Sequence, residues 1–114
     1  MDTRGLKAFC RRFPEAVETR HGEPYNFLEY SVRGRTFAYF KTSAPERWRF
    51  SVRVEPDRFL PLIDMPGVKP ARWRGRWHWV TIVEVRRFPA EYLRELVTWS
   101  YHRAATTRRK GKPR

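Results

Sequence analysis

The sequence predicts an α+β fold of two layers, in which helices pack on one face of an antiparallel five-stranded sheet. Several segments alternate between apolar and polar side chains, which is the period of a half-buried strand. Tight turns that contain glycine join these segments, and such turns favour antiparallel neighbours. Near both ends of the chain, apolar residues recur at helical spacing instead, so helices can cover the apolar face of the sheet.

The first helix is predicted over residues 3–12. Thr3 can cap its start, and Pro14 ends it because proline disfavours helical geometry in the residue before it. A polar turn is expected over residues 19–24. Cys10 is the single cysteine of the chain, which excludes an intramolecular disulfide, and we expect it to be a small apolar residue of this helix.

Two hairpins that share an Arg-Gly-Arg tip are predicted. Glycine suits such a tip because a tight hairpin turn needs a positive φ. The hairpins run over residues 26–41 and 71–85, with tips at Arg33-Gly34-Arg35 and Arg74-Gly75-Arg76. In the second, residues 71–73 are expected to pair with residues 77–85.

A strand and a short helix are predicted between the hairpins. Residues 48–54 show the clearest alternation in the chain, with Arg49 and Arg53 on the polar side. Pro56 suits the first turn of a helix. Pro61 lies inside that helix and cannot donate the helical hydrogen bond, so the helix should be short or kinked.

The rest of the chain completes the order α-β(3)-α-β(2)-α. Residues 65–70 are expected to be a plain turn segment, and the longest helix should begin after Pro89 and extend to about Ala105. No change in composition marks an internal boundary. We therefore predict one domain over residues 1–106 and a basic, mobile tail over residues 107–114.

The charge of the chain points to an anionic partner. Its 114 residues include 25 Lys and Arg against 12 Asp and Glu, which gives a net charge of +13. An excess of this size attracts phosphate-bearing molecules, although basicity without a specific partner stays open as the alternative. No apolar run has the ~20 residues of a membrane span, and the N-terminus lacks the apolar stretch of a signal peptide. The expected compartment is therefore the cytoplasm.

The order and spacing of several short segments resemble the MmcQ/YjbR family from about Leu6 to Ala105. These segments are Phe13-Pro14-Glu15-Ala16-Val17-Glu18, His21-Gly22-Glu23-Pro24, Gly34-Arg35-Thr36-Phe37-Ala38, Pro66-Gly67-Val68 with Pro70, Trp79-Val80-Thr81-Ile82 and Ser100-Tyr101. The resemblance implies an α-β(3)-α-β(2)-α fold that is similar to secretion-chaperone-like folds. It also implies DNA binding, with two hairpin wings as the contact elements.

The segment from Arg72 to Trp79 interleaves basic and aromatic residues at strand spacing. The planar fork of arginine suits phosphate oxygens or a guanine edge, and tryptophan can stack on an unpaired base. The alternative is that Trp77 or Trp79 packs in the core while the arginines solvate the turn. The candidate nucleic-acid contacts are Arg33, Arg35, Arg49, Arg53, Arg72, Arg74 and Arg76 in the hairpins and sheet, and Arg108, Arg109 and Lys110 in the tail.

No catalytic centre, metal site or cofactor site is predicted. His21, His78 and His102 fall on different elements without the spacing of metal ligands. The chain has no glycine-rich phosphate loop, and Ser100 lies within a helix beside Tyr101 instead of on a nucleophile turn.

The prediction is therefore a non-enzymatic protein that binds double-stranded DNA through arginine-rich hairpins and its tail. A protein-interaction module for an acidic protein partner is the alternative from another class. Binding of RNA or a single strand is a third reading, which requires Trp73, Trp77 or Phe27 to be exposed on the sheet.

Overall fold

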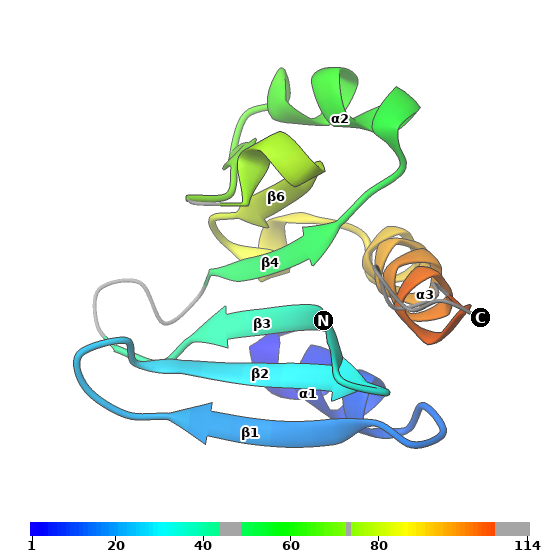
Figure 1. The fold of residues 1–114 in the computed structure, drawn as a ribbon. Coiled ribbons are helices and arrows are strands. Elements are labelled where there is room, and N and C mark those ends of the chain that lie inside the picture. Colours follow the sequence, from blue (N-terminus) through cyan, green and yellow to red (C-terminus); the bar gives the residue numbers. More distant parts are fainter. Residues whose placement is uncertain (44–48, 73, 107–114) are drawn as a thin grey trace.

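The computed structural model describes residues 1–43, 49–72 and 74–106, and for Arg76 it describes the backbone alone. Along these residues the chain forms an α+β fold with a six-stranded sheet (Figure 1). The elements are α1 (Thr3–Arg11), β1 (Val17–His21), β2 (Phe27–Val32), β3 (Arg35–Lys41), β4 (Phe50–Arg53), α2 (Pro56–Ile63), β5 (Val68–Pro70), the 3₁₀ turn η1 (Gly75–Trp77), β6 (Trp79–Ile82), the 3₁₀ turn η2 (Val85–Arg87) and α3 (Ala90–Thr106).

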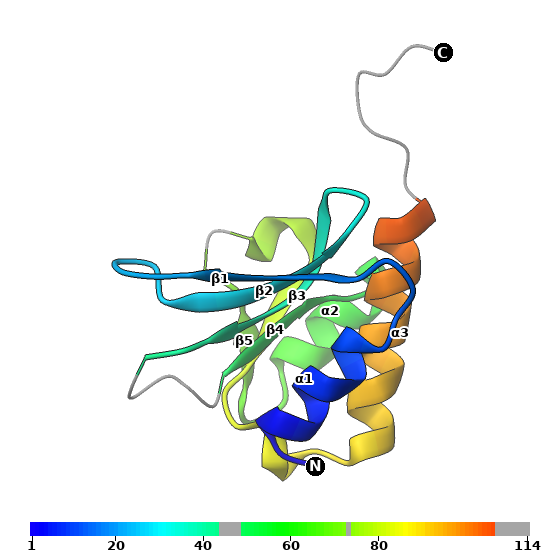
Figure 2. The ribbon, with the colours of Figure 1, turned by 90° about the horizontal axis from the view of Figure 1, so that it is seen from below.

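The sheet is antiparallel throughout, with the strand order β1-β2-β3-β4-β6-β5. Helices α1 and α3 pack on one side of it, and α2 packs against β5 and β6 (Figure 2). The opposite side, which faces the viewer in Figure 1, carries η1. This side is called the open face below.

The hydrophobic core lies between the sheet and the helices. Alternate residues of the strands point into it, so that Leu28, Tyr30 and Val32 of β2 are buried while their neighbours are half-buried. From the helices, the core receives Leu6 and Cys10 of α1, Leu62 of α2 and the buried face of α3. Along the described residues, no helix combines the length and the apolar character that a bilayer crossing requires.

The main elements agree with the sequence analysis. Helix α3 buries the residues that recur at helical spacing in its sequence, namely Leu93, Leu96, Val97, Ser100 and Ala104. The first hairpin turns as expected, because Arg33 and Gly34 both have positive φ, at 51° and 78°. Helix α2 is short and contains Pro61. The N-cap of α1 is Asp2 and not Thr3, since Asp2 Oδ1 accepts a 2.9 Å hydrogen bond from the backbone N–H of Gly5.

The prediction of five strands is wrong, because β1 was read as a turn, and β5 takes the place of the strand predicted from Ala71. Strand β1 covers half of the expected polar turn, and β5 lies inside the segment expected to be a plain turn. The side chains of β1 are exposed from Val17 to Arg20, so no apolar alternation marks this strand in the sequence. Its pairing with β2 comes from the backbone instead.

The predicted second hairpin is shifted along the chain. Strand β6 pairs with β5, and of the predicted first arm Ala71 continues this pairing, since its backbone N–H donates a 3.0 Å hydrogen bond to the carbonyl oxygen of Trp79. Arg74-Gly75-Arg76 is not a tight tip but lies within the longer connection that contains η1. The left-handed conformation in this connection falls on His78, whose φ is 70°. Gly75 meets a different requirement, since a Cβ there would lie 3.1 Å from the Cβ of Pro70.

Candidate nucleic-acid interface

A groove of about 750 Å³ runs across the open face of the sheet. Most of its lining side chains are basic or aromatic. The basic residues are Lys41, Arg49, Lys69, Arg72 and Arg74, and the aromatic residues are Tyr25, Phe27 and Tyr39. No carboxylate occurs among the described residues that line it. We call this site the basic groove.

The register of the sheet brings these residues onto one face. Tyr39 of β3 lies opposite Ser51 of β4, Ser51 lies opposite Thr81 of β6, and Thr81 lies opposite Lys69 of β5. The neighbouring row, which begins at Ala38, is buried in the core on the other side. Because side chains alternate along a strand, the row from Tyr39 to Lys69 must point to the open face.

The floor of the basic groove combines hydroxyl groups with aromatic rings. The hydroxyl oxygens of Ser51 and Thr81 lie 2.7 Å apart in a buried hydrogen bond. The rings of Phe27 and Tyr39 meet edge to face with their centroids 5.6 Å apart, and Tyr25 is 66% exposed at the rim. The rings of Phe27 and Tyr39 therefore pack against each other on the groove floor, and the ring of Tyr25 is exposed to solvent at the rim.

Arg74 lies over two aromatic rings at one wall of the groove. The central carbon of its guanidinium is 5.2 Å from the ring centroid of Tyr39 and 5.0 Å from that of Trp79. Cation–π contacts at these distances hold a guanidinium in place. Trp79 is buried, as the sequence analysis allowed, but it lies under Arg74 on the open face and outside the hydrophobic core cluster.

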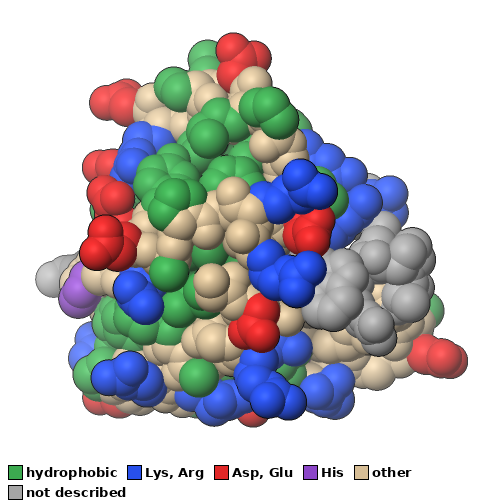
Figure 3. Space-filling model, turned by 180° about the vertical axis from the view of Figure 1, so that it is seen from behind, with side chains coloured by type: hydrophobic (Ala, Val, Ile, Leu, Met, Phe, Trp, Pro, Cys, Tyr) green, Lys and Arg blue, Asp and Glu red, His purple; other side chains and the backbone are tan. Residues whose placement is uncertain are grey.

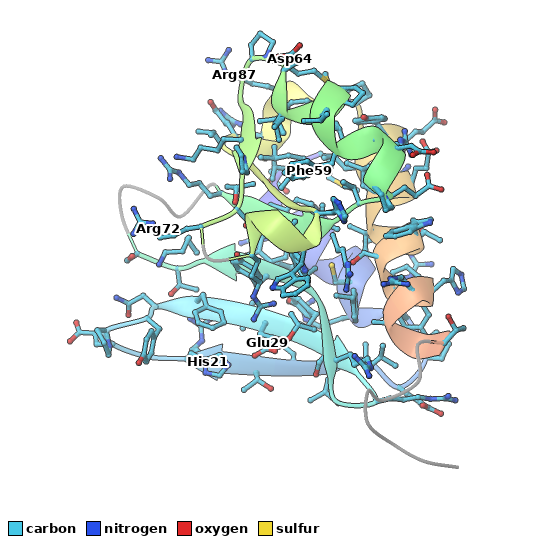
Figure 4. All side chains as sticks on the ribbon, turned by 45° about the horizontal axis from the view of Figure 1, so that its top comes forward. His21, Glu29, Phe59, Asp64, Arg72 and Arg87 are labelled. Atoms are coloured by element: carbon cyan, nitrogen blue, oxygen red, sulfur yellow. The ribbon has the colours of Figure 1, made fainter. Side chains whose placement is uncertain are left out.

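Glu29 is an acidic residue of the same face, and it is hydrogen-bonded to its neighbours. Its carboxylate bonds to His21 Nε2 at 2.7 Å and accepts from the hydroxyl of Thr36. Burial acts to raise the pKa of Glu29, but the hydrogen bonds of Thr36 and His21 and the charge of Arg74 together lower it. In Figure 4, His21 and Glu29 lie on β1 and β2, away from Arg72 at the other end of the face.

The structure separates the predicted contact residues into three sets. Arg49, Arg72 and Arg74 line the basic groove, and Arg35 and Arg53 line a second cavity that Arg74 also borders. Arg33 lies elsewhere: its guanidinium bonds to the carbonyl oxygen of Ala105 at 3.3 Å and to Glu15 at 3.5 Å. The remaining predictions, on the side chains of Trp73, Arg76, Arg108, Arg109 and Lys110, lie outside the described residues.

Several groove residues were missed by the sequence analysis. Lys41 and Tyr39 belong to a predicted strand, and their spacing of two residues was the signal that both share a face. Lys69 was hidden because its strand was taken for a turn. Tyr25 carries no signal in the sequence, since its place at the rim depends on the path of the β1–β2 connection.

The side of the molecule that carries α1 presents a mixture of charges. Figure 3 shows acidic and basic side chains interspersed over this side, with acidic ones at the left, upper and right borders, most of the basic ones to the right and below, and apolar side chains between them. Several arginines outside the groove form ion pairs with glutamates. These pairs are Arg11 with Glu18 at 2.9 Å, Arg58 with Glu95 at 3.3 Å and Arg87 with Glu84 at 2.9 Å.

No metal centre is apparent in the described part of the chain, where no three His, Cys, Asp or Glu side chains converge. Ser100 is equally unsuited to act as a nucleophile, since it is buried and its hydroxyl donates a 2.7 Å hydrogen bond to the carbonyl oxygen of Phe37. The groove therefore offers charge and rings for binding.

A six-stranded antiparallel sheet, with helices on one side and a basic groove on the other, defines a basic α+β protein with an open sheet face. The chain belongs to the YjbR family, whose model matches residues 11–103. This match confirms the family that the short sequence segments indicated.

Solved structures agree with this fold. Protein DR2400 of Deinococcus radiodurans, described with the domain DUF419, has 25% identity and a TM-score of 0.79, and the match covers 98% of this chain and 82% of that one. A protein from Pseudomonas syringae has 14% identity and a TM-score of 0.72, with 91% of this chain and 99% of that one covered. No curated protein matches the chain.

Proposed function

We propose that this protein binds single-stranded nucleic acid in the basic groove, without catalysis. The observation that carries the proposal is the composition of the groove, which combines five basic side chains and three aromatic rings with no carboxylate among its described lining residues. Single-strand binding surfaces use this combination, because cations follow the phosphate backbone while rings stack on unpaired bases.

The aromatic residues favour a single strand over a duplex. In a duplex the base faces are stacked on one another, so rings on a sheet surface cannot reach them. Phe27 is half-buried on the sheet and lines the groove, whereas Trp77 is 53% exposed but lies on η1, so the condition that the sequence analysis set for a single-strand ligand is met in part. An acidic protein partner would account for the charge of the groove but not for its aromatic rings.

The hairpin tips give less support to duplex binding than the sequence analysis expected. Duplex binding was assigned to the arginine-rich hairpins and the tail, but of the two Arg-Gly-Arg tips only the first lies at a tight hairpin turn. In that first tip, Arg33 is hydrogen-bonded to Glu15 and to the end of α3. The groove is therefore the better candidate for contact with phosphates.

The charge of the groove sets the expected salt dependence. If all five basic side chains contact phosphates of a single strand, log K should fall with log salt at a slope of about −3.5, from roughly 0.7 counterions released per contact. A slope near zero would contradict phosphate contact.

Fluorescence anisotropy with labelled oligonucleotides of equal length tests the proposal. Single-stranded DNA, single-stranded RNA and duplex DNA should be compared across a salt series, with tighter binding expected for a single strand. Arg72→Gln should weaken binding, whereas Arg87→Gln, which removes the same charge from an ion pair outside the groove, should not. Absence of binding at low salt, or equal losses in the two variants, would refute the proposal.

A further inference from the structure

A second cavity, of about 240 Å³, adjoins the basic groove at Arg74. It lies between the β2–β3 turn, the end of β4 and the last turns of α3. Four arginines line it, namely Arg35, Arg53, Arg74 and Arg103, and no carboxylate occurs among its described lining residues. We call it the arginine pocket.

Each arginine reaches the pocket from a different element. Arg35 begins β3, Arg53 ends β4 and Arg103 lies near the end of α3. Arg74 comes from the connection between β5 and β6, where its guanidinium lies over Trp79. Arg53 lies opposite Trp79 in the sheet, and all four arginine side chains line the same cavity.

The guanidinium of Arg53 is close enough to two other arginines of the pocket for their charges to act on it. Burial lowers the pKa of Arg53, and the positive charges of Arg103 and Arg35 lower it further. A small anion in this cavity would be attracted by the positive charges that line it.

The hydroxyl groups of the pocket already donate to protein acceptors. Ser100 donates to the carbonyl oxygen of Phe37, and Thr36 donates to Glu29. The guanidinium groups are the charged donors that line the pocket. Planar guanidinium forks match the oxygen atoms of phosphate groups, often with two hydrogen bonds from one arginine.

We infer that the arginine pocket binds a phosphoryl group that carries two negative charges. Its 240 Å³ is below the range of about 300–1,000 Å³ for pockets that enclose a drug-sized molecule, so it suits a small anion or one end of a larger ligand. The group can come from a free phosphate compound or from the terminal phosphate of a strand, because Arg74 borders the groove as well.

Two measurements on the full chain distinguish these sources. The first is titration calorimetry with inorganic phosphate and with pyrophosphate, at constant ionic strength in chloride. The second is anisotropy with one oligonucleotide in two forms, with a 5′-phosphate and with a 5′-hydroxyl. If calorimetry detects binding of phosphate or pyrophosphate that the pocket variants weaken, the ligand is a free compound. If the oligonucleotide with a 5′-phosphate binds more tightly than the one with a 5′-hydroxyl, and the pocket variants remove this difference, the ligand is a strand end.

Variants within and outside the pocket provide the control. Arg53→Gln and Arg103→Gln should each weaken phosphoryl binding about tenfold or more, as expected for loss of hydrogen bonds from a charged donor. Arg87→Gln, which removes the same charge outside both cavities, should change it less than about twofold. Arg103 is exposed, so this variant should fold even if Arg53→Gln does not.

The inference is wrong if neither pocket variant changes the binding of phosphate, pyrophosphate or the 5′-phosphorylated strand, or if Arg87→Gln causes the same loss. These outcomes can be separated from failure of the proposed function. Binding of the 5′-hydroxyl strand reports on the basic groove, and it should persist in Arg53→Gln whether or not the pocket takes a phosphoryl group.

Discussion

The guanidinium of Arg74 covers the indole of Trp79, with 5.0 Å between its central carbon and the ring centroid. This contact places a positive charge on the wall shared by the basic groove and the arginine pocket. Tyr39 holds the same guanidinium from the side of the groove. The position of Arg74 therefore depends on ring stacking, which a lysine would not reproduce in the same way.

Arg74→Lys is expected to weaken single-strand binding although the charge is retained, because the ammonium group lacks the planar surface that stacks on Tyr39 and Trp79. Anisotropy titration measures the effect, which should be severalfold. Arg58→Lys is the matched control, since Arg58 lies 5.6 Å from the ring centroid of Tyr92, outside both cavities. Equal losses in the two variants would show that stacking by Arg74 has no special role.

Tyr25→Ala should reduce single-strand affinity without reducing stability. Its ring is 66% exposed at the rim of the groove, and a base stacked on such a ring contributes about 1–3 kcal/mol of binding free energy. Leu60→Ala removes an apolar side chain that is 70% exposed on α2, away from the groove, and should leave affinity unchanged. Thermal melting of both variants, measured in parallel, should match the parent protein.

Ser100→Ala should lower the free energy of unfolding by about 1–3 kcal/mol, because the variant leaves the buried carbonyl of Phe37 without its side-chain donor. Urea unfolding followed by circular dichroism measures the loss. Thr98→Ala removes a hydroxyl that bonds to the carbonyl of Arg94 on the exposed side of the same helix, and its effect should stay within about 0.5 kcal/mol. Similar losses in both would contradict a special role for the Ser100 bond.

Gly75→Ala should destabilise the protein by about 1–3 kcal/mol, since the new methyl group would lie 3.1 Å from the Cβ of Pro70 and the connection must shift. The same shift should weaken single-strand binding, because this connection carries Arg72 and Arg74. Gly22→Ala is the control, as nothing lies within 4 Å of its added carbon. Retained affinity in Gly75→Ala would mean that the connection tolerates movement.

Cys10 should react slowly with thiol reagents in the folded protein and rapidly after unfolding. Burial raises the pKa of its thiol from 9.0 to about 12, so little thiolate forms at pH 8. The folded state binds this proton more tightly than the unfolded state does. The stability contributed by the protonated thiol is therefore complete below pH 9 and is lost as the pH rises toward about 12. Fast modification at pH 8 under native conditions would contradict the burial of Cys10.

Sequence patterns predict the elements that bury one face. Strand β2 and helix α3 follow their expected ranges within one or two residues, because alternating or helical spacing of apolar residues reflects a buried side. Strand β1 has no buried face, and backbone hydrogen bonds with β2 hold it at the edge of the sheet. Strand β5 is short and contains Lys69 and Pro70, whose composition is that of a turn.

The candidate site was predicted only in part, because it depends on contacts between distant segments. Arg49, Arg72 and Arg74 were expected to contact an anion, but the register that sets Tyr39 opposite Ser51 could not be read from either strand alone. Arg103 was missed for a related reason. Its place in the arginine pocket depends on where α3 ends relative to the first hairpin. The hydrogen bond from Arg33 to the carbonyl oxygen of Ala105 joins this hairpin to the end of α3.

Strand β1 is the last strand on its side of the sheet, and its exposed side chains include Glu18 and Arg20. A second copy of the chain that added its own edge strand here would bring these charges close to its own. Charged side chains on an outer strand discourage such joining of sheets. The polar character that concealed β1 in the sequence is thus the kind that keeps edge strands of other proteins from joining.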